Sequence, residues 1–305
     1  MWYNINRNGQ LGNRLFSRAH VYAAAKELGE TVVDWGLMDV AKHFPNVSQS
    51  PIPTYPLLDD GSSPDLPQSF LASERVLELM HKLRPRTTGQ FGNMWCQTWG
   101  KGDPEPYRFD SDAFKEFNAR YETKILSGFK FRCVDWVRKH SDDIRKYFEP
   151  HQSLMTKWQV TRECWHERFD RVIGIHIRLS DFRTAASGKY FVPPEGYAKI
   201  IRERVEFDPQ TTLFVVCTDE SFRDAARYAE FEKSFEGLNV FINQGDLMDD
   251  LVGLMHCDQL VGAGNSTFSR WAAFAGNVEW AGFRSSMIDD DTLPQFIKGP
   301  IPWDF

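Results

Sequence analysis

The second half of the chain alternates apolar runs of strand length with runs whose apolar residues recur at helical spacing, and this alternation constrains the fold more than any other feature. The expected strands are Val172–Ile177, Leu213–Cys217, Asn239–Ile242, Gln259–Gly262 and Val278–Ala281. The expected helices between them are Pro194–Phe207, Glu220–Phe231, Leu247–His256 and Thr267–Ala275. Five strands alternating with four helices predict a parallel, right-handed, doubly wound sheet.

The first residues of the chain predict a separate βαβ unit. A strand over Trp2–Ile5 is followed by a glycine turn, a helical run that ends at Gly29, and a strand over Thr31–Asp34. The turn has the spacing Gly-x-x-Gly at Gly9 and Gly12, which differs from the Gly-x-Gly-x-x-Gly of dinucleotide-binding folds. Such a turn either lets backbone amides approach a ligand or is a tight turn with no ligand, and the sequence favours neither.

The remainder of the first half predicts less regular structure. Residues 45–70 indicate a long surface loop, residues 73–83, 110–122 and 141–168 indicate helices, and residues 86–108 indicate an irregular segment. We place a domain boundary near 165–170, giving an N-terminal domain of residues 1–167 and a C-terminal domain of residues 168–305. The aromatic residues of the irregular segment either cap the core or form a surface on which a sugar stacks.

Composition excludes several classes of protein. A net charge of −6 gives no sign of the basic face that a nucleic-acid-binding protein needs. The five cysteines are odd in number and widely spaced, which predicts reduced, mostly buried thiols instead of a disulfide framework or a zinc site. The first residues lack the pattern of a signal peptide, and no apolar run approaches the roughly 18 residues that span a bilayer, so we expect no transmembrane segment and a cytoplasmic location.

Three of the predicted parallel strands are followed by polar segments, which are His176–Asp181, Thr218–Glu220 and Gly264–Ser269. Because parallel strands open onto one edge of the sheet, these segments are expected to meet there. A helix N-terminus with hydroxyl groups suits a phosphate, and Arg178 can pair with the same phosphate through two hydrogen bonds. Asp219 could accept from a ribose hydroxyl or a base N–H. Asp219 and Ser266 could instead cap the helices that follow them, and a residue that caps a helix can still bind a ligand. The edge therefore predicts a nucleotide site.

Four stretches resemble the GT-B fucosyltransferases, above all the alpha-1,2-fucosyltransferases, with the protein O-fucosyltransferases as more distant relatives. They lie in family order, cover about a fifth of the chain, and are Gly9–Phe16, His176–Asp181, Val216–Asp219 and the block from Asp249 to Ala273 that contains Asn265-Ser266-Thr267-Phe268-Ser269. Three residues depart from the family pattern. Arg14 stands for a usual Gln, Leu179 for a frequent second Arg, and Arg270 for the first Trp of a pair.

The resemblance implies two Rossmann-like domains that face a cleft, with GDP-fucose bound by the C-terminal domain and a glycan hydroxyl as acceptor. Arg178 would be the catalytic residue, because it would hold the β-phosphate and stabilise the charge on the leaving diphosphate. Asp181 would orient Arg178 or its loop instead of acting as a base. The implied donor-binding residues are Gly12, Asn13, His176, Asp181, Asp219, Asn265, Ser266, Thr267 and Phe268. No metal and no cofactor besides the donor substrate is implied.

The acceptor side rests on aromatic content alone, and its candidates are Trp95 and Trp99, with Tyr107 and Trp158 as further ones. Two other functions stay open. A transferase of the same fold could use another nucleotide sugar, given Leu179 and Arg270, and a non-catalytic protein could bind sugars or nucleotides. The presence of Arg178 argues against the non-catalytic alternative, and the missing glycine fingerprint argues against a dehydrogenase.

Overall fold

The computed structural model divides the chain into two compact units, Met1–His151 and Gln152–Pro302. It describes residues 1–7, 9–68, 72–83, 89–91, 94–99, 107–128, 130–184, 187, 191–219, 225–263, 266–283 and 297–298. The division falls before the helix Gln152–His166, so the contacts group that helix with the second unit. The predicted domain boundary lies at the other end of the same helix.

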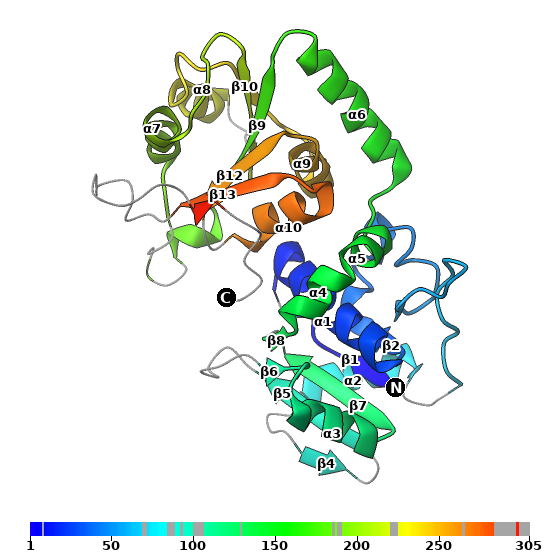
Figure 1. Cartoon of the computed structure of the whole chain (residues 1–305). Coiled ribbons are helices and arrows are strands. Elements are labelled where there is room, and N and C mark those ends of the chain that lie inside the picture. Colours follow the sequence, from blue (N-terminus) through cyan, green and yellow to red (C-terminus); the bar gives the residue numbers. More distant parts are fainter. Residues whose placement is uncertain are drawn as a thin grey trace. The chain divides into compact units, whose positions relative to one another are not determined.

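The second unit is built on a six-stranded sheet of order β11-β10-β9-β12-β13-β14 (Figure 1). Its strands are β9 (Arg171–Ile177), β10 (Thr212–Thr218), β11 (Val240–Ile242), β12 (Gln259–Ala263), β13 (Glu279–Phe283) and β14 (Ile297–Lys298). The first five run parallel, and β14 joins β13 antiparallel at the edge. The alternation predicted from the sequence is confirmed, and β9 lies between β10 and β12.

Helices cover both faces of this sheet, as Figure 1 shows with α7 and α8 on one side and α6, α9 and α10 on the other. They are α6 (Gln152–His166), α7 (Pro194–Arg204), α8 (Ala225–Lys233), α9 (Leu247–Met255) and α10 (Thr267–Gly276). Alternate residues of β9 serve the two faces, since Ile173, Ile175 and Ile177 pack in the core beneath α7 and α8. Gly174 faces α9, where a Cβ would lie 2.9 Å from Leu254 Cδ2 of that helix and 2.4 Å from Leu260 Cδ2 of β12, so a larger residue would push α9 and the Leu260 side chain away.

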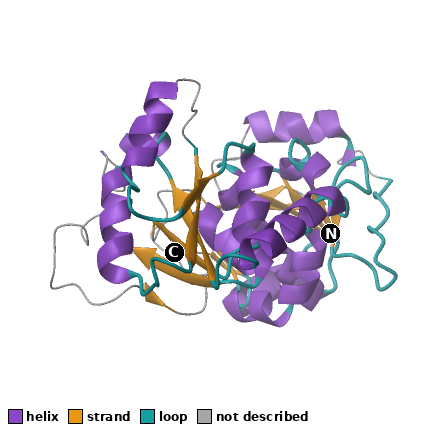
Figure 2. Cartoon of the chain, turned by 90° about the horizontal axis from the view of Figure 1, so that it is seen from above, coloured by secondary structure: helices purple, strands orange, loops and turns teal. Residues whose placement is uncertain are grey.

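The first unit also has a six-stranded sheet, of order β3-β2-β1-β7-β5-β4. Its strands are β1 (Trp2–Asn4), β2 (Val32–Asp34), β3 (Thr54–Tyr55), β4 (Gly89–Phe91), β5 (Met94–Trp99) and β7 (Thr123–Gly128), while β6 (Tyr107–Arg108) and β8 (Phe131–Arg132) pair separately. The helices are α1 (Leu11–Leu28), α2 (Glu74–Leu83), α3 (Asp112–Arg120), α4 (Val134–Lys139) and α5 (Ser141–Tyr147), with short 3-10 turns at Trp35–Leu37 and Ala41–His43. Figure 2 shows the helices of the chain in purple and the strands of its sheets in orange.

Local chemistry explains the opening βαβ unit. The long helix α1 ends at Gly29, which has a φ of 65° in the left-handed region, and the Gly29 N–H donates to the Ala25 carbonyl. This is the helix end that the glycine predicted. A buried core then joins the sheet to α2, through Tyr3, Ile5, Val33, Trp35 and Leu77.

Three sequence predictions for the first unit were wrong or incomplete. The segment expected to be irregular contains the hairpin β4–β5, and β5 pairs in parallel with β7. β7 itself was missed, although it lies next to β1 in the sheet. The predicted helix over 141–168 is two helices separated at Phe148–His151, because Pro150 cannot continue a helix.

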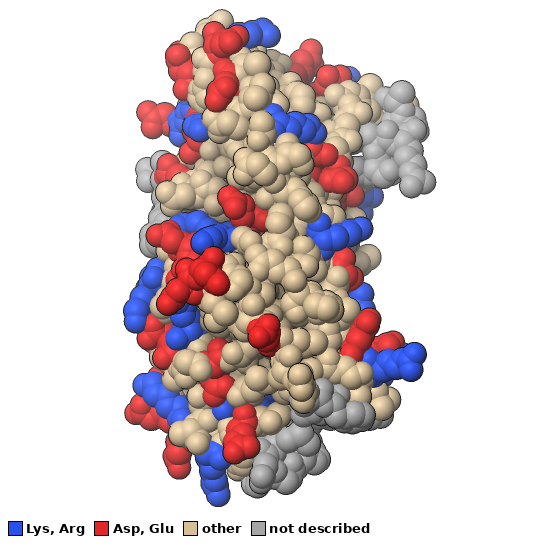
Figure 3. Space-filling model, turned by 90° about the vertical axis from the view of Figure 1, so that its right-hand side faces the viewer, with Lys and Arg blue, Asp and Glu red and all other residues tan. Residues whose placement is uncertain are grey.

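Charged side chains of both signs are interspersed on the face of the molecule that Figure 3 shows. In the part of the chain that the structure describes, no helix combines the length and apolar character that crossing a membrane requires. Within the same residues, Cys133, Cys217 and Cys257 are buried free thiols, as expected from the sequence, whereas Cys164 is exposed.

Candidate functional site

The three strands that carry polar segments are neighbours, in the order β10-β9-β12. His176 of β9 is in register with Cys217 on one side and with Gly262 on the other. The residues that follow these strands therefore meet at one carboxyl edge of the sheet, as the sequence predicted. This edge contains Arg178 and Asp219, and the N-terminus of α10 follows β12 there.

His176 is buried among the groups of this edge. It is 5% exposed, its Nδ1 lies 3.1 Å from Ser266 Oγ, and its ring centroid lies 4.9 Å from that of Phe268. Burial and, after it, the Arg178 charge lower the pKa of His176, Asp219 opposes them, and the net result is a pKa of about 4. The imidazole is therefore neutral at neutral pH and joins β9 to α10 by a neutral hydrogen bond.

Ser266 is the N-cap of α10. Its hydroxyl accepts from the Ser269 N–H, which satisfies one of the backbone donors at the helix start. Ser266 is fully buried, and Thr267 and Phe268 in the first turn are each 6% exposed. No acidic residue lies in that turn, so the N-terminus of α10 keeps its positive end. Ser266 thus caps α10 and also contacts His176 of the site, as expected.

Arg178 directly follows β9 and is 7% exposed. Its guanidinium carbon lies 4.9 Å from the ring centroid of Phe182, in the 3-10 turn Asp181–Arg183, so the charge stacks on an aromatic ring. The backbone of Arg178 also hydrogen-bonds Tyr197 of α7, whose pKa burial raises and this bond opposes. Phe182 and Tyr197 were not singled out from the sequence, because nothing local connects them to Arg178.

Leu179 and Asp219 hold the chain beyond Arg178. The Leu179 side chain is 2% exposed and lies in the core with Ile177 and Tyr197, which explains why an apolar residue stands at this position. The Asp219 carboxylate accepts from the Leu179 N–H at 2.7 Å, from the Ser180 N–H at 3.2 Å, and from the Ser180 hydroxyl. Asp219 thus contacts the β9 segment, a contact that sequence reasoning did not anticipate.

A buried carboxyl group, Asp250 of α9, lies near the ends of β10 and β11. It is 9% exposed and accepts from Asn243 Nδ2 at 2.7 Å, and Cys217 of β10 lies beside it. Burial raises its pKa to about 7, while the Asn243 and Cys217 hydrogen bonds oppose the rise. The sequence placed Asp250 in a family-like stretch but gave it no role, since nothing in the sequence revealed its burial.

Arg270, the other departure from the family pattern, lies in α10. It is 6% exposed, its guanidinium carbon is 4.9 Å from the ring centroid of Trp280 in β13, and burial lowers its pKa to about 10. The planar guanidinium head of Arg270 thus stacks on an aromatic ring in the interior of the second unit.

In the first unit, Gly12 and Asn13 lie in the first turn of α1, Gly12 buried and Asn13 exposed. Gly9 has a φ of 88°, which only glycine adopts readily, and a Cβ there would lie 2.9 Å from Asn13 Cβ. Arg14 donates to the Gly9 carbonyl at 2.9 Å and to Asp39 at 2.7 Å. Burial raises the pKa of Asp39, but the hydrogen bond and charge of Arg14 outweigh it and hold that pKa below its usual range. Arg14 thus fastens the glycine turn.

A buried ion pair lies at the ends of β1 and β2. Arg18 Nε lies 3.1 Å from Asp34 Oδ2, and both side chains are fully buried. The Asp34 carboxylate also accepts from Asn4 Nδ2 at 3.0 Å and from the Tyr55 hydroxyl at 2.6 Å, while Arg18 donates to the Asn6 carbonyl. These contacts fix the chain as it leaves β1 toward the glycine turn.

Several predicted site residues cannot be placed in full. Asn265 lies outside the described residues, and so does the side chain of Asp181, whose backbone lies in the turn after β9. Trp95 and Trp99 lie in β5 instead of an irregular segment, and their side chains are also outside the described part. Trp158 is 2% exposed against α9 and therefore does not offer a ring to a sugar.

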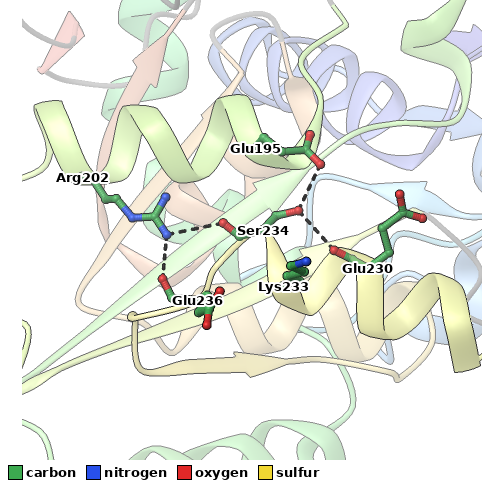
Figure 4. A pocket seen from close by; sticks show the side chains of 6 residues that line it. All are labelled: Glu195, Arg202, Glu230, Lys233, Ser234 and Glu236. Carbon is green, nitrogen blue, oxygen red and sulfur yellow. Dashed lines mark hydrogen bonds between the residues drawn. The ribbon is translucent and has the colours of Figure 1, made fainter.

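A surface pocket of about 740 Å³ lies elsewhere in the second unit (Figure 4). It is lined by residues of α7, of α8 and of the segment after α8, namely Glu195, Arg202, Glu230, Lys233, Ser234 and Glu236. Its polar groups bond one another, since Arg202 Nη2 donates to the Glu236 carbonyl at 2.8 Å and the Ser234 hydroxyl to Glu195 at 3.2 Å. The pocket contains none of the predicted site residues. Among the described side chains, no three His, Cys, Asp or Glu come together as a metal site requires.

Comparisons with known proteins connect this fold to one group of enzymes. No protein-family model and no curated protein matches the sequence. Fucosyltransferase NodZ from Bradyrhizobium is similar in structure, with a TM-score of 0.55 and 16% identity over 98% of this chain and 99% of that chain. NodZ alpha-1,6-fucosyltransferase soaked with GDP-fucose gives a TM-score of 0.53 and 15% identity over 99% of both chains.

A variant of Arabidopsis thaliana FUT1 in complex with GDP is also similar, with a TM-score of 0.54 and 15% identity over 92% of this chain and 70% of that chain. At these identities the likeness concerns the fold. The predicted fold class is confirmed, because the chain is a mixed α/β protein with parallel sheets that matches GT-B fucosyltransferase structures.

Proposed function

We propose that this protein is an inverting, metal-independent glycosyltransferase that transfers fucose from GDP-fucose to a hydroxyl of a glycan. One observation carries the proposal. Arg178, His176 and the N-terminus of α10 meet at the carboxyl edge of a parallel sheet, in a chain whose fold is similar to that of a fucosyltransferase soaked with GDP-fucose.

The edge has the chemistry that a sugar diphosphate needs. The guanidinium of Arg178 and the positive end of α10 are two sources of positive charge with fixed positions. Both lie in a largely buried environment, where an interaction with an anion is stronger than in water. His176 is neutral there and can hydrogen-bond without adding charge. We therefore propose that His176, Thr267 and Phe268 bind the donor together with Arg178. Ser266 supports them by its hydrogen bond to His176 and by capping α10.

The reaction follows from this charge arrangement. The acceptor hydroxyl oxygen forms a bond to the anomeric carbon as the bond from that carbon to the β-phosphate oxygen breaks. The electron pair leaves with the diphosphate, and the hydroxyl proton is released to water. Negative charge therefore grows on the leaving group, where Arg178 stabilises it. A preorganised donor of this kind contributes roughly 3–4 kcal/mol at other sites. Attack from the face opposite the diphosphate inverts the anomeric configuration.

The acceptor is proposed to bind through the first unit, with Trp95 and Trp99 as its candidate contacts. The sequence motifs resemble those of alpha-1,2-fucosyltransferases, whereas NodZ is an alpha-1,6-fucosyltransferase. The alpha-1,2 linkage is therefore proposed on the resemblance of the sequence motifs alone.

The test is transfer to an array of glycans with GDP-fucose as donor, followed by linkage analysis of the product. Arg178→Ala is expected to abolish transfer, while Arg202→Ala is a matched control because Arg202 lies in the separate pocket on α7. Transfer from a UDP-sugar and not from GDP-fucose would contradict the donor assignment. An alpha-1,6 product would contradict only the linkage.

A further inference from the structure

We propose that Asp219 is a positioning residue, whose carboxylate fixes the main chain immediately after Arg178 and thereby aims the guanidinium. This inference rests on the proposed function for its catalytic consequence. It gives Asp219 a role other than the direct contact with the nucleoside that the sequence suggested.

The geometry begins with the register of two neighbouring strands. Ile177 of β9 lies opposite Thr218 of β10, so the next residues, Arg178 and Asp219, leave the sheet side by side. The Asp219 side chain then reaches across to the two residues that follow Arg178. It accepts at Oδ1 from the Leu179 N–H at 2.7 Å and from the Ser180 N–H at 3.2 Å, and at Oδ2 from the Ser180 hydroxyl.

The chain at Arg178 is thus held from several directions. Leu179 is anchored in the core on the side of α7, and its N–H is held by Asp219. The Arg178 backbone hydrogen-bonds Tyr197, and the guanidinium stacks on Phe182. Because Ile177 and Leu179 both point into the core, Arg178 between them must point to the side on which His176 lies.

Stability alone does not explain this arrangement. Asp219 and Ser180 are both exposed, and a hydrogen bond that water can replace contributes little to the free energy of unfolding. A bond of this kind still restricts the main chain to one path. A misplacement of about 1 Å in a catalytic group can reduce the rate about 100-fold, so positional restriction is where this carboxylate has its largest effect.

Three variants test the inference. Asp219→Ala removes all three hydrogen bonds, Ser180→Ala removes only the one from the hydroxyl, and Asp219→Asn keeps a carbonyl oxygen of the same reach. We expect Asp219→Ala to lower kcat about 10- to 100-fold and to weaken GDP binding by a clearly smaller factor. Asp219→Asn should recover most of the lost kcat. The effects of Asp219→Ala and Ser180→Ala should be less than additive, because both act on one set of contacts.

Amide hydrogen exchange provides a readout that does not depend on activity. In Asp219→Ala the amides of Leu179 and Ser180 are expected to exchange at least about tenfold faster, while the β12 amides stay unchanged. Unchanged exchange would overturn the inference, and so would a loss of GDP affinity as large as the loss of kcat, which would indicate direct nucleotide contact. If exchange rises but the wild type transfers no fucose, the positioning role holds and the proposed function fails.

Discussion

The imidazole Nδ1 of His176 and the hydroxyl of Ser266 lie 3.1 Å apart, and through this pair β9 is joined to the first turn of α10. The two residues are 90 positions apart in the chain. Their hydrogen bond depends on a neutral imidazole, since burial lowers the pKa of His176 to about 4. The site is therefore sensitive to acid in a way that can be measured.

We expect acid to destabilise the second unit through His176. The pKa in the folded state, about 4, lies below the ordinary histidine value of 6.5, so the stabilisation is complete above pH 6.5 and is lost as pH falls through 4. A difference of this size corresponds to roughly 3 kcal/mol. Urea unfolding at pH 7 and pH 4 should show a smaller loss of stability in His176→Gln than in the wild type. Substitution of the exposed His151 by Gln is the control. Equal losses of stability in the wild type and in His176→Gln would refute the assignment.

Asp250 should have the opposite pH dependence. Its folded-state pKa of about 7 lies above the ordinary aspartate value of 3.8, so the stabilisation is present below pH 3.8 and is lost as pH rises through 7. Asp250→Asn should therefore stabilise the protein more at pH 8 than at pH 4, by up to about 4 kcal/mol. Chemical unfolding at both values measures this, with Asp249→Asn as a neighbouring control that pairs with Lys157. A pH-independent difference would mean that Asp250 is not buried as described.

Gly262 sets the distance between β12 and α10. A Cβ there would lie 2.8 Å from Ser269 Oγ and 3.2 Å from Ser269 Cβ. Gly262→Ala is expected to destabilise the protein by about 1–3 kcal/mol and to weaken GDP binding, because α10 must shift. Adding Ser269→Ala removes the nearest atom, so the double variant should regain part of both losses. Calorimetric titration with GDP and thermal unfolding measure the two effects, and a double variant no better than Gly262→Ala would locate the strain elsewhere.

The sequence predicted the second unit well because each of its strands carries its own apolar signal. Leu213–Cys217, for example, is an uninterrupted apolar run that β10 contains. β7 was missed, since Thr123 to Gly128 mixes charged, polar and apolar residues in a strand that tertiary packing determines. The β4–β5 hairpin was missed because glycine and aromatic residues conceal its pairing.

For the candidate site too, local features could be predicted from the sequence and long-range contacts could not. Strand ends and a helix start are local features, so the edge formed by His176, Arg178 and Ser266 could be predicted from spacing. The contact of Asp219 with Leu179 and Ser180 joins residues about 40 positions apart, and burial of Asp250 depends on three elements. Contacts of that kind depend on register and packing, which no short motif records.

Binding of nucleotides to the wild type tests the central claim most directly. The melting temperature is measured with GDP, GDP-fucose, UDP, UDP-glucose and TDP at equal concentrations, for the wild type, Arg178→Ala and the control Arg202→Ala. A ligand present at 100 times its Kd stabilises a protein by about 2.7 kcal/mol, which gives a clear shift. We expect GDP and GDP-fucose alone to stabilise the wild type and Arg202→Ala, and Arg178→Ala to lose the shift while its own melting temperature stays nearly unchanged. Stabilisation by UDP or TDP compounds in place of GDP, or an equal GDP shift in Arg178→Ala, would contradict a GDP-fucose site at this edge.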